Sequence, residues 1–212
     1  MYLQTYSTCH STSSFLSVVS KLNPDQIQLV QKIGFGELLN LNCSYTPKAL
    51  VSWIVNHFDL ESNAIVFSNG CSFKLCALAV NKILGIPYGG QKILRKPTVQ
   101  ASLFIKNDTK CLGDTPTIKE LIDILSVDAP ADSFLRAFLL FALSTFLCPT
   151  THGHASARYF PPLLNVDEIE SYDWSLLVFE WLIDYVKRYK QKISSGKSPA
   201  LGGCTFFLVV CI

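Results

Sequence analysis

The chain has 212 residues, of which 49% are hydrophobic and 16% charged, and its formal net charge is +2. Globular chains carry about 25% charged residues, so this composition predicts a core-rich folded domain and excludes a disordered chain. So small a net charge gives no argument by itself for binding nucleic acid. The longest apolar stretch, residues 134–148, contains Arg136 and is shorter than the roughly 20 residues of a membrane-spanning helix, so we expect no membrane span.

Residues 1–24 are rich in Ser and Thr and lack the basic and apolar segments of a secretory signal. We interpret them as a flexible lead-in, with an organellar transit peptide as the alternative. The eight cysteines follow no zinc-binding spacing, and without a secretory signal we expect them to be reduced. These features predict an intracellular protein of the nucleus or cytosol that is not secreted.

The first half of the domain predicts three helices and one hairpin. Asn23 and Thr46 are each followed by proline, which is typical of a helix start. Asn69-Gly70 lies between short β-prone runs and predicts a β-hairpin near residues 64–75. Gly85 ends the third helix. The expected helices cover residues 24–33, 47–58 and 76–84.

The second half predicts an irregular segment followed by helices. The stretch from residue 93 to about Thr115 is polar, basic and poorly patterned, so we expect it to be irregular and mobile. Helices are predicted after the capping box formed by Thr117 and Glu120, after Asp132, and after Asp173. The order of elements predicts a single, mainly helical α+β domain with one small hairpin.

Residues 82–92, KILGIPYGGQK, raise the question of a phosphate-binding loop. Their glycines do not have the GxGxxG spacing, and the preceding element is a predicted helix. We therefore interpret Gly85, Pro87, Gly89 and Gly90 as the stop and turn after that helix. We expect no catalytic residue, metal site or cofactor, because no His/Cys/carboxylate pattern marks one.

A basic run lies in the second half of the last long predicted helix. It contains Lys187, Arg188, Lys190 and Lys192 and no acid. Such a run is a candidate contact surface for nucleic acid. The alternative is a solvated helix end, since cations there suit the helix dipole.

The sequence resembles the plant mobile domain, also called the aminotransferase-like plant mobile domain. VNKILGIPYGG is similar to that family's signature, and IGFGELLNL, NAIVFSNGCSFKL, FALSTFLCP, YDWSLLVFEWL and LGGCTFFLVV resemble its other blocks in the same order. We place residues 25–212 in this family, as a short single-domain copy of the type found in grasses. The resemblance implies an origin in plant transposable elements and no pyridoxal site.

Members of the family usually continue beyond the LGGCTFFLVV block, so we expect a C-terminally truncated domain. The truncation predicts that Phe206, Phe207, Val209 and Val210 form an exposed apolar interface. The resulting hypothesis is a non-enzymatic, transposon-derived interaction module that binds a partner protein. The alternatives are a member of a toxin–antidote or inhibitor pair, and a nuclear nucleic-acid-associated protein in transposon silencing. The sequence leaves the oligomeric state open.

Overall fold

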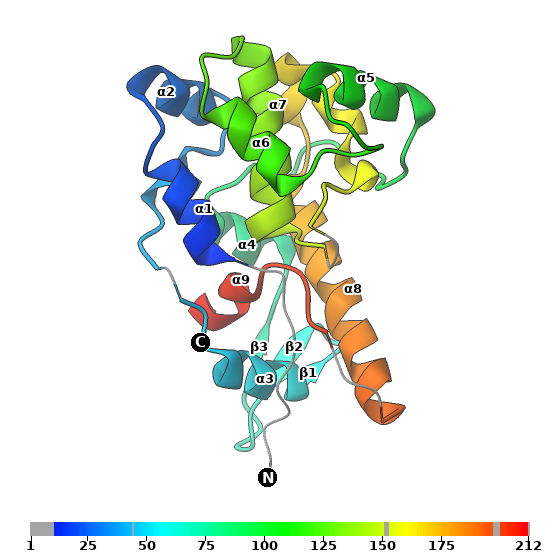
Figure 1. The fold of residues 1–212 in the computed structure, drawn as a ribbon. Coiled ribbons are helices and arrows are strands. Elements are labelled where there is room, and N and C mark those ends of the chain that lie inside the picture. The colour runs from blue at the N-terminus through cyan, green and yellow to red at the C-terminus, as the bar shows by residue number, and fades with distance from the viewer. Residues whose placement is uncertain (1–10, 44, 151–152, 197–199, 212) are drawn as a thin grey trace.

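The computed structural model describes residues 11–43, 45–150, 153–196 and 200–211 (Figure 1). Figure 1 shows a group of helices at one end, a small sheet at the other, and the long helix α8 running along one side between them. The helices are α1 (Thr12–Val19), α2 (Pro24–Lys32), α3 (Lys48–Asn56), α4 (Ala77–Leu84), α5 (Val99–Thr109), α6 (Ile118–Leu125), α7 (Ala131–Ala142), α8 (Trp174–Ser194) and α9 (Thr205–Val210). This is the mainly helical α+β fold that the sequence predicts.

The sheet has three antiparallel strands in the order β1-β2-β3: β1 (Phe58–Asp59), β2 (Ala64–Val66) and β3 (Ser72–Lys74). The predicted hairpin is therefore confirmed as β2–β3, with Ile65 opposite Phe73. The strand β1 was not expected, because residues up to 58 were assigned to a helix. That helix, α3, begins after Pro47 and ends at Asn56, so the expected start at Thr46 is also wrong. Asp59 accepts a hydrogen bond from the Ser62 N–H at 2.9 Å, which turns the chain back towards β2.

The core is centred on α7 and the π-helical turn η2 (Leu143–Leu147) that continues it. α7 follows Pro130 rather than an Asp132 cap. Phe15 of α1 is fully buried and stacks on Phe146 with ring centroids 5.0 Å apart. The predicted flexible lead-in is therefore wrong for residues 11–24, since apolar side chains in this segment pack on α7 and η2. Residues 1–10 lie outside the described part.

The segment expected to be irregular contains the helix α5. The Thr98 side chain caps it by accepting a hydrogen bond from the Ala101 N–H at 3.2 Å. Its apolar side chains lie on more than one face: Ile105 is buried, whereas Val99 is 78% exposed. This mixed placement explains why no helical period is visible in the sequence.

The helix caps are the features that the sequence predicts most accurately. Thr117 and Glu120 form the capping box of α6, and the Asp173 carboxylate accepts from the Leu176 N–H at 2.8 Å to start α8. Gly85 ends α4 with a positive φ of 62°. Each of these contacts joins residues close in sequence, which is why the residue types alone predict them.

The prediction of an exposed apolar C-terminal interface is wrong for Phe206 and Phe207. Phe206 is 7% exposed and Phe207 is fully buried, because α9 packs against α3 and α4. Phe206 also contacts the Phe146 ring at 5.6 Å. Val209 is half-buried, and Val210 remains 49% exposed. Among the described helices, none has both the length and the apolar character needed to cross a membrane.

Candidate functional site: a basic pocket beside the signature turn

The turn over residues 85–91 is anchored at both ends. The Asn81 side chain donates to the Ile86 carbonyl at 2.9 Å, and the Ser175 N–H donates to the Pro87 carbonyl at 3.0 Å. Gln91 then forms a parallel bridge with Tyr172. The turn is thus tied both to α4, whose C-cap is Gly85, and to the start of α8.

Gly89 and Gly90 are each required in this turn for a different physical reason. Gly89 has a φ of 81°, a conformation that other residues adopt at a cost, but a side chain there would meet open space. A Cβ atom on Gly90 would lie 2.1 Å from the Ser171 carbonyl oxygen. Gly90 therefore permits the backbone of the turn to touch the backbone that precedes α8.

A pocket of about 330 Å³ begins where the turn ends. Its lining comes from two segments far apart in the chain, residues 91–98 and residues 158–172. Four cationic side chains line it: Lys92, Arg95, Lys96 and Arg158. Ile93, Leu94, Pro161 and Pro162 add apolar surface, and Thr98 and Tyr172 add polar atoms. We call this the basic pocket.

Two of the four cations are neutralised by α8. Lys92 pairs with Glu180 at 2.5 Å, and Arg95 pairs with Asp184 at 2.7 Å and more distantly with Glu180. Within the described part of the chain, neither Lys96 nor Arg158 has a carboxylate within 4.0 Å. The basic pocket therefore carries about two positive charges that no acid balances.

Contacts with the surrounding structure hold three of the four cations, Lys92, Arg95 and Arg158. The Arg158 guanidinium lies 5.9 Å from the centre of the Trp181 ring, which is 4% exposed. A cation at that distance is attracted by the ring face. The ion pairs of Lys92 and Arg95 attach the other wall of the pocket to α8. These contacts hold most of the cationic lining of the pocket in place.

Exposed apolar side chains occur in and after the segment that lines the basic pocket: Leu94 lines the pocket, and Val99 directly follows the lining residue Thr98. Leu94 is 73% exposed, Val99 is 78% exposed and Leu103 is 56% exposed. Val99 and Leu103 are four residues apart in α5, so they share one helix face. We call these three residues the apolar rim. A cationic pocket next to exposed apolar side chains is typical of a binding surface.

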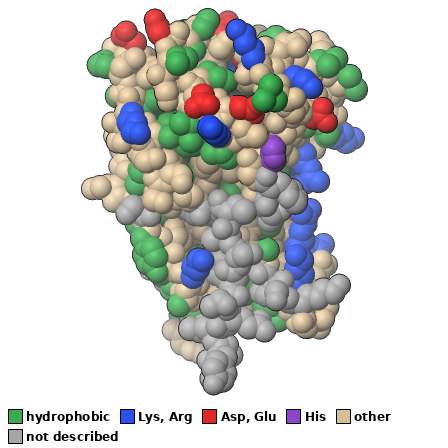
Figure 2. All heavy atoms as spheres, in the orientation of Figure 1, with side chains coloured by type: hydrophobic (Ala, Val, Ile, Leu, Met, Phe, Trp, Pro, Cys, Tyr) green, Lys and Arg blue, Asp and Glu red, His purple; other side chains and the backbone are tan. Residues whose placement is uncertain are grey.

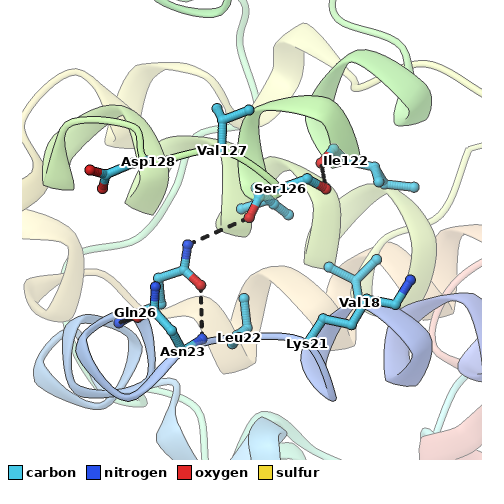
Figure 3. Close-up of a pocket in the computed structure, with 10 residues that line it drawn as sticks. Val18, Lys21, Leu22, Asn23, Gln26, Ile122, Ser126, Val127 and Asp128 are labelled. Atoms are coloured by element: carbon cyan, nitrogen blue, oxygen red, sulfur yellow. Dashed lines mark hydrogen bonds between the residues drawn. The ribbon is translucent and has the colours of Figure 1, made fainter.

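A second cavity, of about 550 Å³, lies between the α1–α2 corner and the end of α6 (Figure 3). Its polar groups already pair with one another: Asn23 and Gln26 form a capping box, and the Gln26 amide donates to the Leu125 carbonyl at 3.5 Å. One lysine, Lys21, and one acid, Asp128, balance its charge. Because its polar groups are paired and its charges balance, this cavity is a weaker candidate for a binding site than the basic pocket.

The predicted basic contact surface on α8 divides into two groups. Lys187, Arg188 and Lys192 are exposed, and Figure 2 shows Lys and Arg side chains along the edge where α8 runs. Lys190 is different, because its ammonium donates to the Phe58 carbonyl at 2.5 Å. Desolvation lowers the pKa of Lys190, although the nearby Asp59 opposes that shift. Lys190 therefore ties α8 to β1 and is not a free contact residue.

The described cysteines are all free thiols. Burial raises the pKa of Cys148 well above its ordinary value and raises that of Cys204 to about 12. Both thiols are neutral near pH 7 and unsuited to nucleophilic attack. No group of three His, Cys, Asp or Glu residues suited to a metal ion occurs in the described residues. His154 is exposed and forms an isolated antiparallel bridge with Thr117.

The structure is a mainly helical α+β domain, and the basic pocket is its candidate binding site. The chain belongs to the family described as "Domain of unknown function (DUF8566)", whose model matches residues 8–209.

The chain is also similar to "Protein MAIN-LIKE 2" of Arabidopsis thaliana, with 24% identity over 192 residues. The match covers 82% of this chain but 28% of that protein. MAIN-LIKE 2 is a plant mobile domain protein, so this likeness supports the family that the signature predicts. No solved structure matches the chain.

Proposed function

We propose that this protein is a non-catalytic interaction module, derived from a plant transposable element, that binds an acidic segment of a partner protein. The observation that carries the proposal is the basic pocket, in which Lys96 and Arg158 have no acidic partner among the described residues. Positive surfaces of this kind attract acidic partners and favour them over basic ones. The likeness to MAIN-LIKE 2 supports the transposon-derived origin.

The apolar rim supports a protein partner over a nucleic acid. Leu94, Val99 and Leu103 expose apolar area to solvent beside the cations. Removing apolar area from water contributes roughly 25 cal/mol per Å², whereas contacts to a phosphate backbone need only cations and donors. A partner segment with acids near apolar side chains would complement both parts of the surface.

A nucleic-acid-associated role is the second candidate, and the exposed cations of α8 favour it. Lys187, Arg188 and Lys192 lie in the second half of α8, which in Figure 1 runs away from α5. Binding through them would weaken steeply as salt rises and would be insensitive to substitutions in the basic pocket.

The test compares two variants that carry the same change in charge. In the first, Lys96→Glu and Arg158→Glu reverse the basic pocket. In the second, Lys187→Glu and Arg188→Glu reverse the exposed face of α8. The tagged wild-type chain and both variants are used for affinity purification from plant extract, and recovered proteins are re-tested in purified form.

The proposal predicts a partner that the wild type and the α8 variant recover and the pocket variant loses. Its affinity for the purified chain should survive moderate salt because of the apolar rim. A partner that is retained by the pocket variant and lost by the α8 variant would contradict the proposal and support the second candidate.

A further inference from the structure

We infer that the basic pocket recognises a phosphate monoester, carried on a phosphorylated side chain of the partner segment. This inference rests on the proposed function and names the chemical group that the pocket selects. It follows from the charge, the donors and the shape of the pocket.

The charge of the pocket matches a dianion better than a carboxylate. Glu180 and Asp184 compensate Lys92 and Arg95, which leaves Lys96 and Arg158 with a combined charge of about +2. A phosphorylated serine or threonine carries about −1.5 to −2 charges at pH 7, whereas a glutamate carries one. One phosphate therefore neutralises the pocket, and a carboxylate would leave it positive.

The pocket also supplies donors of the kind that phosphate accepts. The planar Arg158 guanidinium can donate two parallel hydrogen bonds to phosphate oxygens, and Lys96 adds a compact cation. Thr98, the N-cap of the eleven-residue helix α5, lines the same pocket. The Thr98 hydroxyl oxygen accepts from Ala101, so its proton is available to a ligand.

The start of α5 adds a further contribution. The first N–H groups of a helix have no acceptor inside the helix, and the helix dipole places partial positive charge there. Phosphates bind readily at such ends when other donors are present. Here the end of the helix adds to a pocket that already contains uncompensated cations.

The shape of the pocket leaves room for the residue that carries the phosphate. Its volume of about 330 Å³ lies at the lower end of the range for small ligand sites, roughly 300–1,000 Å³. Ile93, Pro161 and Pro162 form apolar walls, and the apolar rim continues outside. This arrangement suits a phosphorylated side chain inserted into the pocket with apolar neighbours outside it.

The experiment uses fluorescently labelled degenerate peptide pools whose central residue is phosphoserine, serine or glutamate. Binding to the full chain is measured by anisotropy at pH 7.5 and pH 5.5. We expect the phosphoserine pool to bind at least tenfold more tightly than the glutamate pool. The second phosphate pKa is about 6, so we also expect weaker binding at pH 5.5.

Two alanine variants show whether the pocket is responsible. Lys96→Ala with Arg158→Ala should reduce phosphoserine binding at least tenfold, whereas Lys187→Ala with Arg188→Ala should leave it within about twofold. All four side chains are exposed, so thermal unfolding should show that both variants remain folded. A single-stranded DNA oligonucleotide is titrated in parallel.

Each outcome decides the inference. Equal binding of the phosphoserine and glutamate pools overturns it but leaves the acidic-segment proposal intact. Failure of every pool, with pocket-dependent recovery of a partner from extract, also overturns only the phosphate inference. Failure of both assays contradicts the proposed function itself. Tight DNA binding that disappears in the pocket variant overturns the inference in favour of nucleic acid.

Discussion

Gly90→Ala should disrupt the turn that leads into the basic pocket. The added Cβ atom would lie 2.1 Å from the Ser171 carbonyl oxygen, well inside the 3.0 Å that Cβ atoms essentially never pass. The nearest atoms are backbone, so no flexible side chain can move aside. Relief requires the turn and the residues before α8 to separate.

The cost of that separation has two parts. Overpacking against well-ordered structure costs about 1–3 kcal/mol. The separation also weakens the Gln91 N–H bond to Ser171 at 2.7 Å and the Asp173 N–H bond to Gln91 at 2.9 Å. Each hydrogen bond contributes about 0.5–1.5 kcal/mol. We expect a loss of about 3 kcal/mol, which corresponds to a fall in Tm of about 6–12 °C for a domain of this size.

Gly89→Ala is the matched control. Its φ of 81° makes alanine unfavourable by roughly 1–2 kcal/mol, but no atom lies near the added methyl group. Urea denaturation of both variants and the wild type measures the difference. The reasoning is refuted if Gly90→Ala is no more destabilised than Gly89→Ala, because the close approach to Ser171 would then have no energetic effect.

Three further predictions concern the fold. Arg136→Met should lower the free energy of unfolding by about 3–5 kcal/mol, because Arg136 is 6% exposed and its loss leaves the Asp108 carboxylate, 3.2 Å away, without its cation. Adding Asp108→Asn should restore part of that free energy in denaturation experiments. Phe15→Ala should cost about 3–5 kcal/mol by thermal unfolding if α1 belongs to the core, and no change would contradict that placement. Hydrogen bonds from Leu112 and Thr117 lower the pKa of Glu120. The ionised Glu120 carboxylate therefore stabilises the fold above about pH 4.3, and this effect is lost as pH falls through the lowered pKa. Glu120→Gln should abolish that part of the pH dependence, which is measured as the free energy of unfolding at several pH values.

The parts of the fold that were predicted correctly depend on contacts local in sequence. Asn23 as the cap of α2, Thr117 with Glu120, and Gly85 at the end of α4 act within four residues or on a single backbone conformation. The missed elements depend on distant contacts. α5 has apolar side chains on exposed and buried faces, and α9 is covered by α3 and α4, which precede it by more than 100 residues.

The candidate site was beyond prediction for the same reason. Arg158 follows Lys96 by about sixty residues, and no local pattern indicates that they line one pocket. The sequence did contain one signal, the cluster of Lys92, Arg95 and Lys96 directly after the signature turn. Arg95 and Lys96 fall in the stretch that the sequence predicts to be irregular, and nothing in the sequence indicates that acids of α8 neutralise Lys92 and Arg95.

If Lys96 and Arg158 bind an acidic partner through the basic pocket, reversing their charges should weaken that binding. Calorimetric titration measures this with the purified partner segment and three proteins: the wild-type chain, the Lys96→Glu/Arg158→Glu variant and the Lys187→Glu/Arg188→Glu variant. We expect the pocket variant to lose affinity at least tenfold, since hydrogen bonds to charged groups contribute about 1.5–3 kcal/mol each, and the α8 variant to lose less than about twofold. Unchanged affinity in the pocket variant, or equal losses in both variants, would contradict it.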